Sequence, residues 1–332
     1  IGNEVFFGCF GLTSDIIPES VTTIGSSAFF YCSSLTSVNI PNVTTIERET
    51  FAYCTSLTSV TIPECVSSIE FSAFHGCYNL QKVIVPDISA WLNISFGSSD
   101  ANPLSYAHHL YSDENTEITN LVIPEGITAI KDNVFCGCSG LTSVTLPESV
   151  TSIGSYAFYG CRGWTSVNIP WSVTSIGNQA FSYSHLTYVD IPATVTSIGD
   201  EAFRKDGYSD GGPMTVLIRD ASHLELGEKV FYSWVSNRNT FYVMPSTTSE
   251  YIVEKLQPYA KSLKFCDVYV DSVLYRIMSD GEVEAIHHMS ITEEVILPDF
   301  IVIGDKTFRV VSLADQMFCI DPNNTYTLSP LK

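Results

Sequence analysis

Apolar residues recur along the chain at a fixed interval. Eight times an isoleucine is followed five positions later by a phenylalanine, and these isoleucines recur with a nearly constant spacing, except between Ile69 and Ile130. The eight pairs are Ile1/Phe6, Ile24/Phe29, Ile46/Phe51, Ile69/Phe74, Ile130/Phe135, Ile153/Phe158, Ile176/Phe181 and Ile198/Phe203. A unit of this length cannot bury its apolar face alone, so neighbouring units must cover it. The pattern therefore predicts a solenoid of stacked coils, with about 22–23 residues in each coil.

Each unit predicts the same short elements. The run Leu-Thr-Ser-Val-x-Ile alternates apolar and polar residues, as a strand with one inward face does. A proline follows most of these strands and ends the ladder, because proline has no amide hydrogen to donate. A second alternating run, Ser-Val-Thr-Ser-Ile, predicts another short strand on a different side of the coil. The stretch Gly-x-x-Ala-Phe-x-x-Cys predicts a turn of helix or 3₁₀ helix, so we expect the stacked coils to build parallel sheets.

The long interval between Ile69 and Ile130 predicts one lengthened coil. Its non-consensus part is the segment 87–120, in which Trp91 and Leu92 are candidate anchors. We expect a short turn over 106–109 and a hairpin around 113–115. The segment therefore predicts a bulge on the solenoid rather than a separate domain.

The motif weakens toward the C-terminus. Residues 249–263 have helical composition, although Pro258 should shorten that helix. Residues 268–311 alternate in hydrophobicity around a turn at 279–281, which predicts a hairpin. Because an open terminal coil exposes its core, we expect a solenoid over 1–265 and an irregular β-hairpin cap with the restart of a repeat over 266–332.

Ten cysteines do not indicate a disulfide framework here. Six of them lie eight positions after the isoleucine of their unit: Cys9, Cys32, Cys54, Cys77, Cys138 and Cys161. Stacking brings such residues into one row with a spacing of about 5 Å. Free cysteine is among the most buried residue types, so the row predicts small buried side chains. Cys136 and Cys138 form a C-x-C pair without a matching His or Cys cluster, which argues against zinc.

The charge of the chain argues against two classes of partner. Its formal net charge is -20, and residues 1–198 contain only four basic residues, Arg48, Lys82, Lys131 and Arg162. Nucleic acid and anionic membranes require clustered lysine and arginine. No apolar run approaches the roughly 18 residues of a membrane helix. We therefore expect neither nucleic-acid binding nor membrane insertion.

The repeated signature resembles a known family. Ile-Gly-x-x-Ala-Phe-x-x-Cys-x-x-Leu-Thr-Ser-Val, which covers most of the chain, is similar to the BspA-like leucine-rich repeats of bacterial and some protist surface proteins. The resemblance implies a curved right-handed solenoid, a secreted or surface-anchored protein, and adhesion or ligand binding. It implies no catalytic chemistry.

Candidate chemistry outside the repeat is sparse. The chain has no G-x-S-x-G, P-loop, dinucleotide fingerprint or H-E-x-x-H motif, so we predict neither an enzyme nor a cofactor. Glu282, Glu284, His287 and His288 have the side chains of a metal-ligand set, but a solvated hairpin explains them better. The segment 206–212 offers oxygen atoms and glycines without the spacing of a calcium loop. We therefore predict no metal site.

The outward face of the first strands is the better place for a ligand, because solenoids present an extended surface there. In the C-terminal half, we place Asn168, Tyr188, Asp190, Leu217, Phe241 and Val243 on this face. The apolar members should not lie bare on a soluble monomer. Either the terminal hairpin covers them, or they form a partner site.

Trp171 is the second anomaly, because the position after the proline is otherwise mostly acidic. It serves either as a stacking platform for sugar or peptide, or in local packing. Trp164 replaces the repeat leucine and is expected in the core.

Two functions follow as hypotheses. The first is a non-enzymatic, secreted or cell-surface scaffold for protein binding and adhesion, acting through the strand face. The second is a carbohydrate-binding surface protein of a bacterium, which would use Tyr188 and Trp171 for stacking and Ser, Thr and Asn for hydrogen bonds. Both predict an extracellular protein or glycan as the partner.

Overall fold

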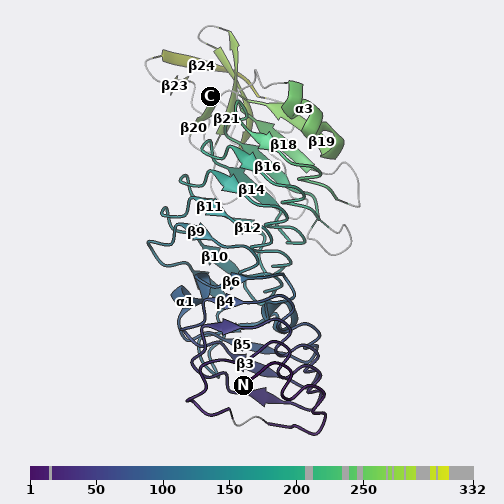
Figure 1. The fold of residues 1–332 in the computed structure, drawn as a ribbon. Coiled ribbons are helices and arrows are strands. Elements are labelled where there is room, and N and C mark those ends of the chain that lie inside the picture. The colour runs from purple at the N-terminus through teal and green to yellow at the C-terminus, as the bar shows by residue number, and fades with distance from the viewer. Residues whose placement is uncertain are drawn as a thin grey trace.

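The coils stack along one axis from the N-terminus to the terminal sheet (Figure 1), as a computed structural model shows. The structure describes residues 1–14, 17–205, 212–233, 239–244, 250–266, 268–270, 273–279, 282–288, 300–303 and 306–313. Each regular coil contributes two short strands and a series of turns. The predicted solenoid of parallel strands is confirmed.

The first strand of each coil faces one side of the stack, which we call the outer strand face. Its strands pair in parallel in three groups, β1-β3-β5-β7, β8-β10 and β12-β14-β16-β18-β19. They are β1 (Ser37–Val38), β3 (Ser59–Thr61), β5 (Lys82–Ile84), β7 (Leu110–Tyr111), β8 (Asn120–Val122), β10 (Ser143–Thr145), β12 (Ser166–Val167), β14 (Tyr188–Ile191), β16 (Thr215–Ile218), β18 (Asn239–Val243) and β19 (Ala260–Phe265).

The second strand of each coil builds a second parallel face. Its strands pair in two groups, β2-β4-β6 and β9-β11-β13-β15-β17. They are β2 (Thr45–Ile46), β4 (Ser68–Ile69), β6 (Ser95–Phe96), β9 (Ala129–Ile130), β11 (Ser152–Ile153), β13 (Ser175–Ile176), β15 (Ser197–Ile198) and β17 (Glu225–Leu226).

The turns between the two strands are hydrogen-bonded in two directions. Within a coil, Tyr159 N donates to Tyr156 O at 3.2 Å, which is the i to i−3 pattern of a 3₁₀ helix. Tyr156 and Gly160 have left-handed backbone, with φ of 57° and 70°, so no continuous helix forms. Instead, the amides of Tyr156, Phe158 and Gly160 donate to carbonyls of the next coil at 2.8–2.9 Å. The predicted helical segment is thus a third ladder between coils.

The phenylalanines form the predicted inward row. Phe29, Phe51 and Phe74 stack in the first half and Phe135, Phe158, Phe181, Phe203 and Phe231 in the second, with ring centroids 5.3–5.5 Å apart. Each of these rings is at most 1% exposed. Trp164 lies beside the row, 3% exposed, and its Nε1 donates to Cys161 O at 2.7 Å. The isoleucine-to-phenylalanine period therefore encodes one continuous core.

The cysteine row is also confirmed as a row of buried thiols, except at Cys9 of the first coil, which is only partly buried. Cys32, Cys54, Cys77, Cys138 and Cys161 are fully buried, and no disulfide links the described cysteines. The thiol of Cys54 donates to Phe29 O at 3.2 Å, and that of Cys77 donates to Phe51 O at the same distance. These two thiols therefore join their coils to the preceding ones.

We expect the buried thiols to stay protonated and unreactive in the folded chain. Burial raises the pKa of Cys32 to about 11 and those of Cys77 and Cys138 to about 12. Iodoacetamide at pH 8 should modify the exposed Cys65 rapidly and the buried row only after denaturation. A Cys65→Ser variant should lose the part of the fast phase that Cys65 contributes, whereas rapid modification of several buried thiols in the native chain would contradict the assignment.

The same shifts set the direction of a pH effect on stability. An unfolded thiol ionises near pH of about 8.5, so the folded state holds these protons more tightly than the unfolded state does. The contribution is fully present below that pH and is lost as the pH rises toward 11–12. Denaturant unfolding between pH 7 and pH 10 should therefore show falling stability.

The lengthened coil takes a regular place in the stack. Its strands β6 and β7 pair in parallel with β4 and β5, and between the strands lie the short helices α1 (Ile88–Leu92) and α2 (Leu104–Ala107). Trp91 and Leu92 are buried, as predicted. Trp91 Nε1 donates to Val134 O at 3.1 Å, and Asn102 Nδ2 donates to Asn133 O at 2.7 Å. In this coil, side chains therefore donate to the next coil the hydrogen bonds that backbone amides donate in the regular coils.

A hairpin projects from the end of this coil, as predicted. Tyr111 and Glu117 form an antiparallel bridge. At the turn, Asp113 Oδ1 accepts hydrogen bonds from Asn115 N at 2.8 Å and Thr116 N at 2.9 Å, and these bonds lower the pKa of the Asp113 carboxyl. We call the segment 111–117 the coil hairpin.

The last regular coil is closed by a helix. The predicted helix over 249–263 is shorter, because α3 (Glu250–Leu256) passes into a 3₁₀ turn (Gln257–Tyr259) at Pro258 and then into β19. Tyr251 Oη accepts from Leu226 N at 3.1 Å and donates to Leu226 O at 3.0 Å, which satisfies the open edge of β17.

A separate sheet follows the last parallel strand. Its order is β20-β21-β22-β24-β23, from β20 (Val268–Val270), β21 (Val273–Ser279), β22 (Glu282–His288), β23 (Phe300–Ile303) and β24 (Lys306–Leu313). The predicted hairpin is confirmed, since β21 and β22 pair antiparallel with Ser279 opposite Glu282. The division into 1–265 and 266–332 remains a prediction, and the change of sheet between β19 and β20 agrees with it.

Candidate functional site

The register of the strands fixes which side chains share the outer strand face. Tyr188 lies between Ser166 and Thr215 in one row. Asp190 pairs with Leu217 in the neighbouring row. Val189, between Tyr188 and Asp190, points into the core and is fully buried. Five of the six predicted ligand residues, Asn168, Trp171, Tyr188, Asp190 and Leu217, therefore belong to three adjacent coils.

The prediction was wrong for the sixth residue, Phe241, and for Val243. Phe241 pairs with Val216 rather than with Leu217, so it points inward, is fully buried and packs edge-on against Phe231 at 5.1 Å. The coil before β18 does not keep the period of the earlier coils, and the predicted register was shifted by one position. Such a shift moves every side chain of a strand to the opposite face. The outward residues of β18 are Thr240 and Tyr242.

Leu217 lies on the predicted face but is not accessible. Leu217 and Tyr242 are 0% and 2% exposed, although neither belongs to the core cluster of the solenoid. Val273 and Tyr275 of the terminal sheet are likewise buried outside that cluster. This end of the outer strand face is therefore covered, and its covering by the terminal hairpin stays a prediction.

Trp171 lies at the corner that follows strand β12, directly after Pro170. Its side chain is 51% exposed, and the guanidinium of Arg219 lies 5.2 Å from the centroid of its ring. Arg219 is held by Asp190 through two hydrogen bonds, Nε to Oδ1 at 2.8 Å and Nη2 to Oδ2 at 2.7 Å. A bidentate pair fixes the plane of the guanidinium. The indole therefore lies against a rigid cation.

Sequence reasoning missed Arg219. The signal was present, because Arg219 follows strand β16 at the position that proline occupies after the earlier strands, such as Pro170 and Pro192. Its side chain reaches past the coil that carries the small Ala193 to contact Trp171 two coils away. Only the stacking of coils brings the three residues together.

The repeat itself decides the family. The model described as "BspA type Leucine rich repeat region" matches residues 1–100 and 109–210 in six copies. These residues make up more than half of the 332-residue chain. The chain belongs to the BspA-type leucine-rich repeat family.

Several solved structures of leucine-rich repeat proteins are similar to this BspA-type chain. One from Bacteroides ovatus is 22% identical, with 77% of this chain and 69% of that one covered and a TM-score of 0.47. A leucine-rich cell surface protein from Faecalibacterium prausnitzii is 23% identical, with coverage of 80% and 82% and a TM-score of 0.37. The pneumococcal vaccine antigen PcpA is 19% identical, with coverage of 77% and 68% and a TM-score of 0.40. No curated protein matches the chain.

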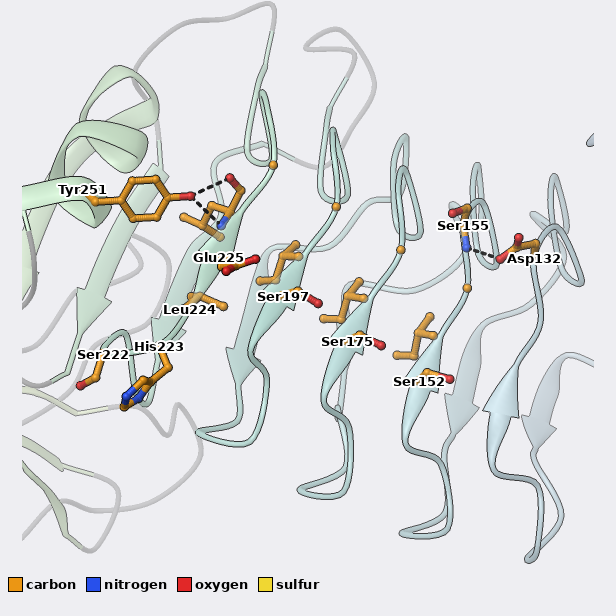
Figure 2. A pocket seen from close by; sticks show the side chains of 18 residues that line it. Asp132, Ser152, Ser155, Ser175, Ser197, Ser222, His223, Leu224, Glu225 and Tyr251 are labelled. Atoms are coloured by element: carbon orange, nitrogen blue, oxygen red, sulfur yellow. Dashed lines mark hydrogen bonds between the residues drawn. The ribbon is translucent and has the colours of Figure 1, made fainter.

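A groove crosses the second face of this BspA-type solenoid. Ser152, Ser175 and Ser197 follow one another on successive coils, and Tyr251 closes the end (Figure 2). Alongside runs a row of glycines where the preceding coil approaches closely, and an Asx residue bridges the coils, as when Asp132 Oδ1 accepts from Ser155 N at 2.7 Å. Contacts between coils explain these small residues, so the groove itself indicates no chemistry.

The other sequence candidates form no site. Among the described residues, no group of three or more His, Cys, Asp or Glu side chains has the arrangement of a metal site. Glu284 Oε2 lies 3.6 Å from Arg276 Nη1. The side chains of Glu282, His287 and His288 lie outside the described part of the chain, as do residues 206–211. In that same part of the chain, no helix has both the length and the apolar character needed to cross a membrane.

Proposed function

We propose that this BspA-type chain is a non-enzymatic binding scaffold, located on the cell surface or secreted, that binds a protein partner through the outer strand face. Family membership supports a scaffold role. One similar solved structure is described as a cell surface protein, which agrees with the proposed location. Adhesion to an extracellular protein is the role that best fits an exposed, rigid strand face.

One observation carries this proposal. Trp171 is half exposed, and two hydrogen bonds to Asp190 fix the Arg219 guanidinium that lies against its ring. Tryptophan and arginine are the residues on which binding energy at protein interfaces most often concentrates. A side chain that is already held in place loses little entropy on binding. Trp171 and its support are therefore suited to act as the anchor of an interface.

The test compares binding of the chain to immobilised extracellular matrix proteins with binding to a glycan array. We expect saturable binding to a matrix protein that weakens by at least about 30-fold in Trp171→Ala, as loss of an interface hot spot of about 2 kcal/mol does. Phe71→Ala is the matched control, because Phe71 is 53% exposed and lies away from this face. Equal binding by the wild type and Trp171→Ala would contradict the proposed anchor.

Carbohydrate binding is the second candidate, and the exposed indole favours it. Trp171 follows, in the same coil, the exposed residues Ser166 and Asn168 of the outer strand face. An aromatic ring with neighbouring hydrogen-bonding groups suits a sugar ring. Binding to defined glycans that is lost in Trp171→Ala, together with no binding to matrix proteins, would favour this function over the first.

A further inference from the structure

The outer strand face is open over only part of its length. Ile84 on β5 and Leu217 on β16 both occupy outward positions, and both are buried outside the core cluster, at 4% and 0% exposure. Between them, the outward side chains of β8, β10 and β12 are exposed and those of β14 are partly exposed. We call these positions the open strand face: Asn120, Val122, Ser143, Thr145, Ser166, Asn168, Tyr188 and Asp190.

The coil hairpin borders the open strand face on its N-terminal side. Lys82 fixes it, because its Nζ donates to Glu114 O at 2.9 Å and lies 5.0 Å from the centroid of the Tyr111 ring. The positive charge of Lys82, which lies on β5, is therefore already engaged by the hairpin. Asp113 and Glu114 remain exposed at the hairpin tip. The border is therefore acidic.

The corner at the C-terminal ends of the strands is acidic as well. Glu125 follows β8 and Glu148 follows β10 at the same position after the proline, and the third member of this row is Trp171. Both carboxylates are exposed, and neither forms an ion pair within the described residues. Adjacent coils are separated by about 5 Å, so the two like charges stand close together and repel.

The interior of the open strand face adds no compensating positive charge. Its outward side chains are hydroxyls, amides, Val122 and Tyr188, and its single acid, Asp190, is paired with Arg219. The Trp171 ring has a guanidinium at 5.2 Å, which is the distance of a cation–π contact. Two unpaired carboxylates and an exposed indole, one on each of three successive coils, are complementary to basic side chains.

We propose that the open strand face binds an extended, basic polypeptide segment, with lysine or arginine side chains of the partner placed along Glu125, Glu148 and Trp171. The inference rests on the proposed protein-binding function and specifies the chemistry of its partner. Four strands at about 4.8 Å spacing give a surface about 15 Å long. That length accommodates four to five residues of extended chain at about 3.3 Å each. Small outward hydroxyls and amides leave such a segment room to lie flat.

The test uses a labelled eight-residue peptide that alternates arginine with threonine, and the same peptide with citrulline in place of arginine. Fluorescence anisotropy with the full chain should show at least tenfold tighter binding of the arginine peptide. Glu125→Gln combined with Glu148→Gln should weaken that binding at least fivefold and flatten its salt dependence. The matched control is Glu19→Gln with Glu64→Gln, which removes the same charge from the same repeat position on coils outside the open strand face.

The outcomes separate this inference from the proposed function. Equal weakening by both double variants would mean that the net charge of -20 attracts the peptide without a site, and the inference would be overturned. The inference would also be overturned if the citrulline peptide bound as tightly as the arginine peptide. If a matrix protein binds through Trp171 while the charge variants leave that binding unchanged, the proposed function stands and the basic partner does not. If neutral glycans bind and neither peptide does, the partner is a carbohydrate rather than a basic polypeptide, and the inference is overturned.

Discussion

Replacing Phe158 by alanine is expected to lower the free energy of unfolding by about 3–5 kcal/mol, the range for truncating a buried aromatic ring. Phe158 is fully buried and stacks between Phe135 and Phe181 at centroid distances of 5.4 and 5.5 Å. It also packs edge-on against Trp164 at 5.4 Å. Removal of the ring leaves a cavity between two coils, which their backbone ladders prevent from closing.

Denaturant unfolding monitored by circular dichroism measures this effect. Phe10→Ala is the control, because Phe10 is 62% exposed and its truncation should change stability by less than about 0.5 kcal/mol. In a solenoid each coil contacts only its neighbours, so hydrogen exchange should increase most around the mutated coil. A loss below about 1 kcal/mol would mean that the phenylalanine row does not carry the core.

Replacing Gly177 by alanine should destabilise the chain by at least about 2–3 kcal/mol, although it adds a single methyl group. A Cβ atom at Gly177 would lie 2.5 Å from Ser155 N and 2.6 Å from Gly154 C of the preceding coil. Backbone atoms cannot rotate away as a side chain does. Gly177 N also donates to Ile153 O at 2.7 Å, so moving the coils apart stretches a hydrogen bond that joins them.

Gly11→Ala is the matched control for this prediction. A Cβ atom at Gly11 would meet no atom within 4 Å, so the substitution should be close to neutral or slightly stabilising. Thermal and denaturant unfolding of the two variants would decide the comparison. Similar stability of both would show that the glycine row does not set the distance between coils.

The core could be predicted from the sequence because its information is local and repeated. The isoleucine, phenylalanine and cysteine positions of one unit recur in the next, so a single period fixes an entire inward row. Where the spacing of the repeat changed, the predicted strand register was wrong. The irregular coil before β18 shifted the register, and Phe241 was placed on the wrong face as a result.

The accessible surface depends on contacts that the period does not encode. Ile84 and Leu217 have the alternation of outward residues, yet other parts of the chain cover both. Trp171 was recognised because it breaks a row of acidic residues, but its partner Arg219 lies 48 positions further along the sequence. A contact across two coils follows from the stacking geometry rather than from neighbouring residues.

The sequence by itself determined the solenoid, its period, its buried phenylalanine and cysteine rows and its family, because each is written into every repeat. The tertiary structure alone decided which outward positions remain open, since Ile84 on β5, the strand that the coil hairpin contacts, and Leu217 on β16 are both buried outside the core cluster. It also decided that an arginine at a lost proline position, held by Asp190, lies against the ring of Trp171. Such contacts join residues of different coils, and only the folded stack sets their distance.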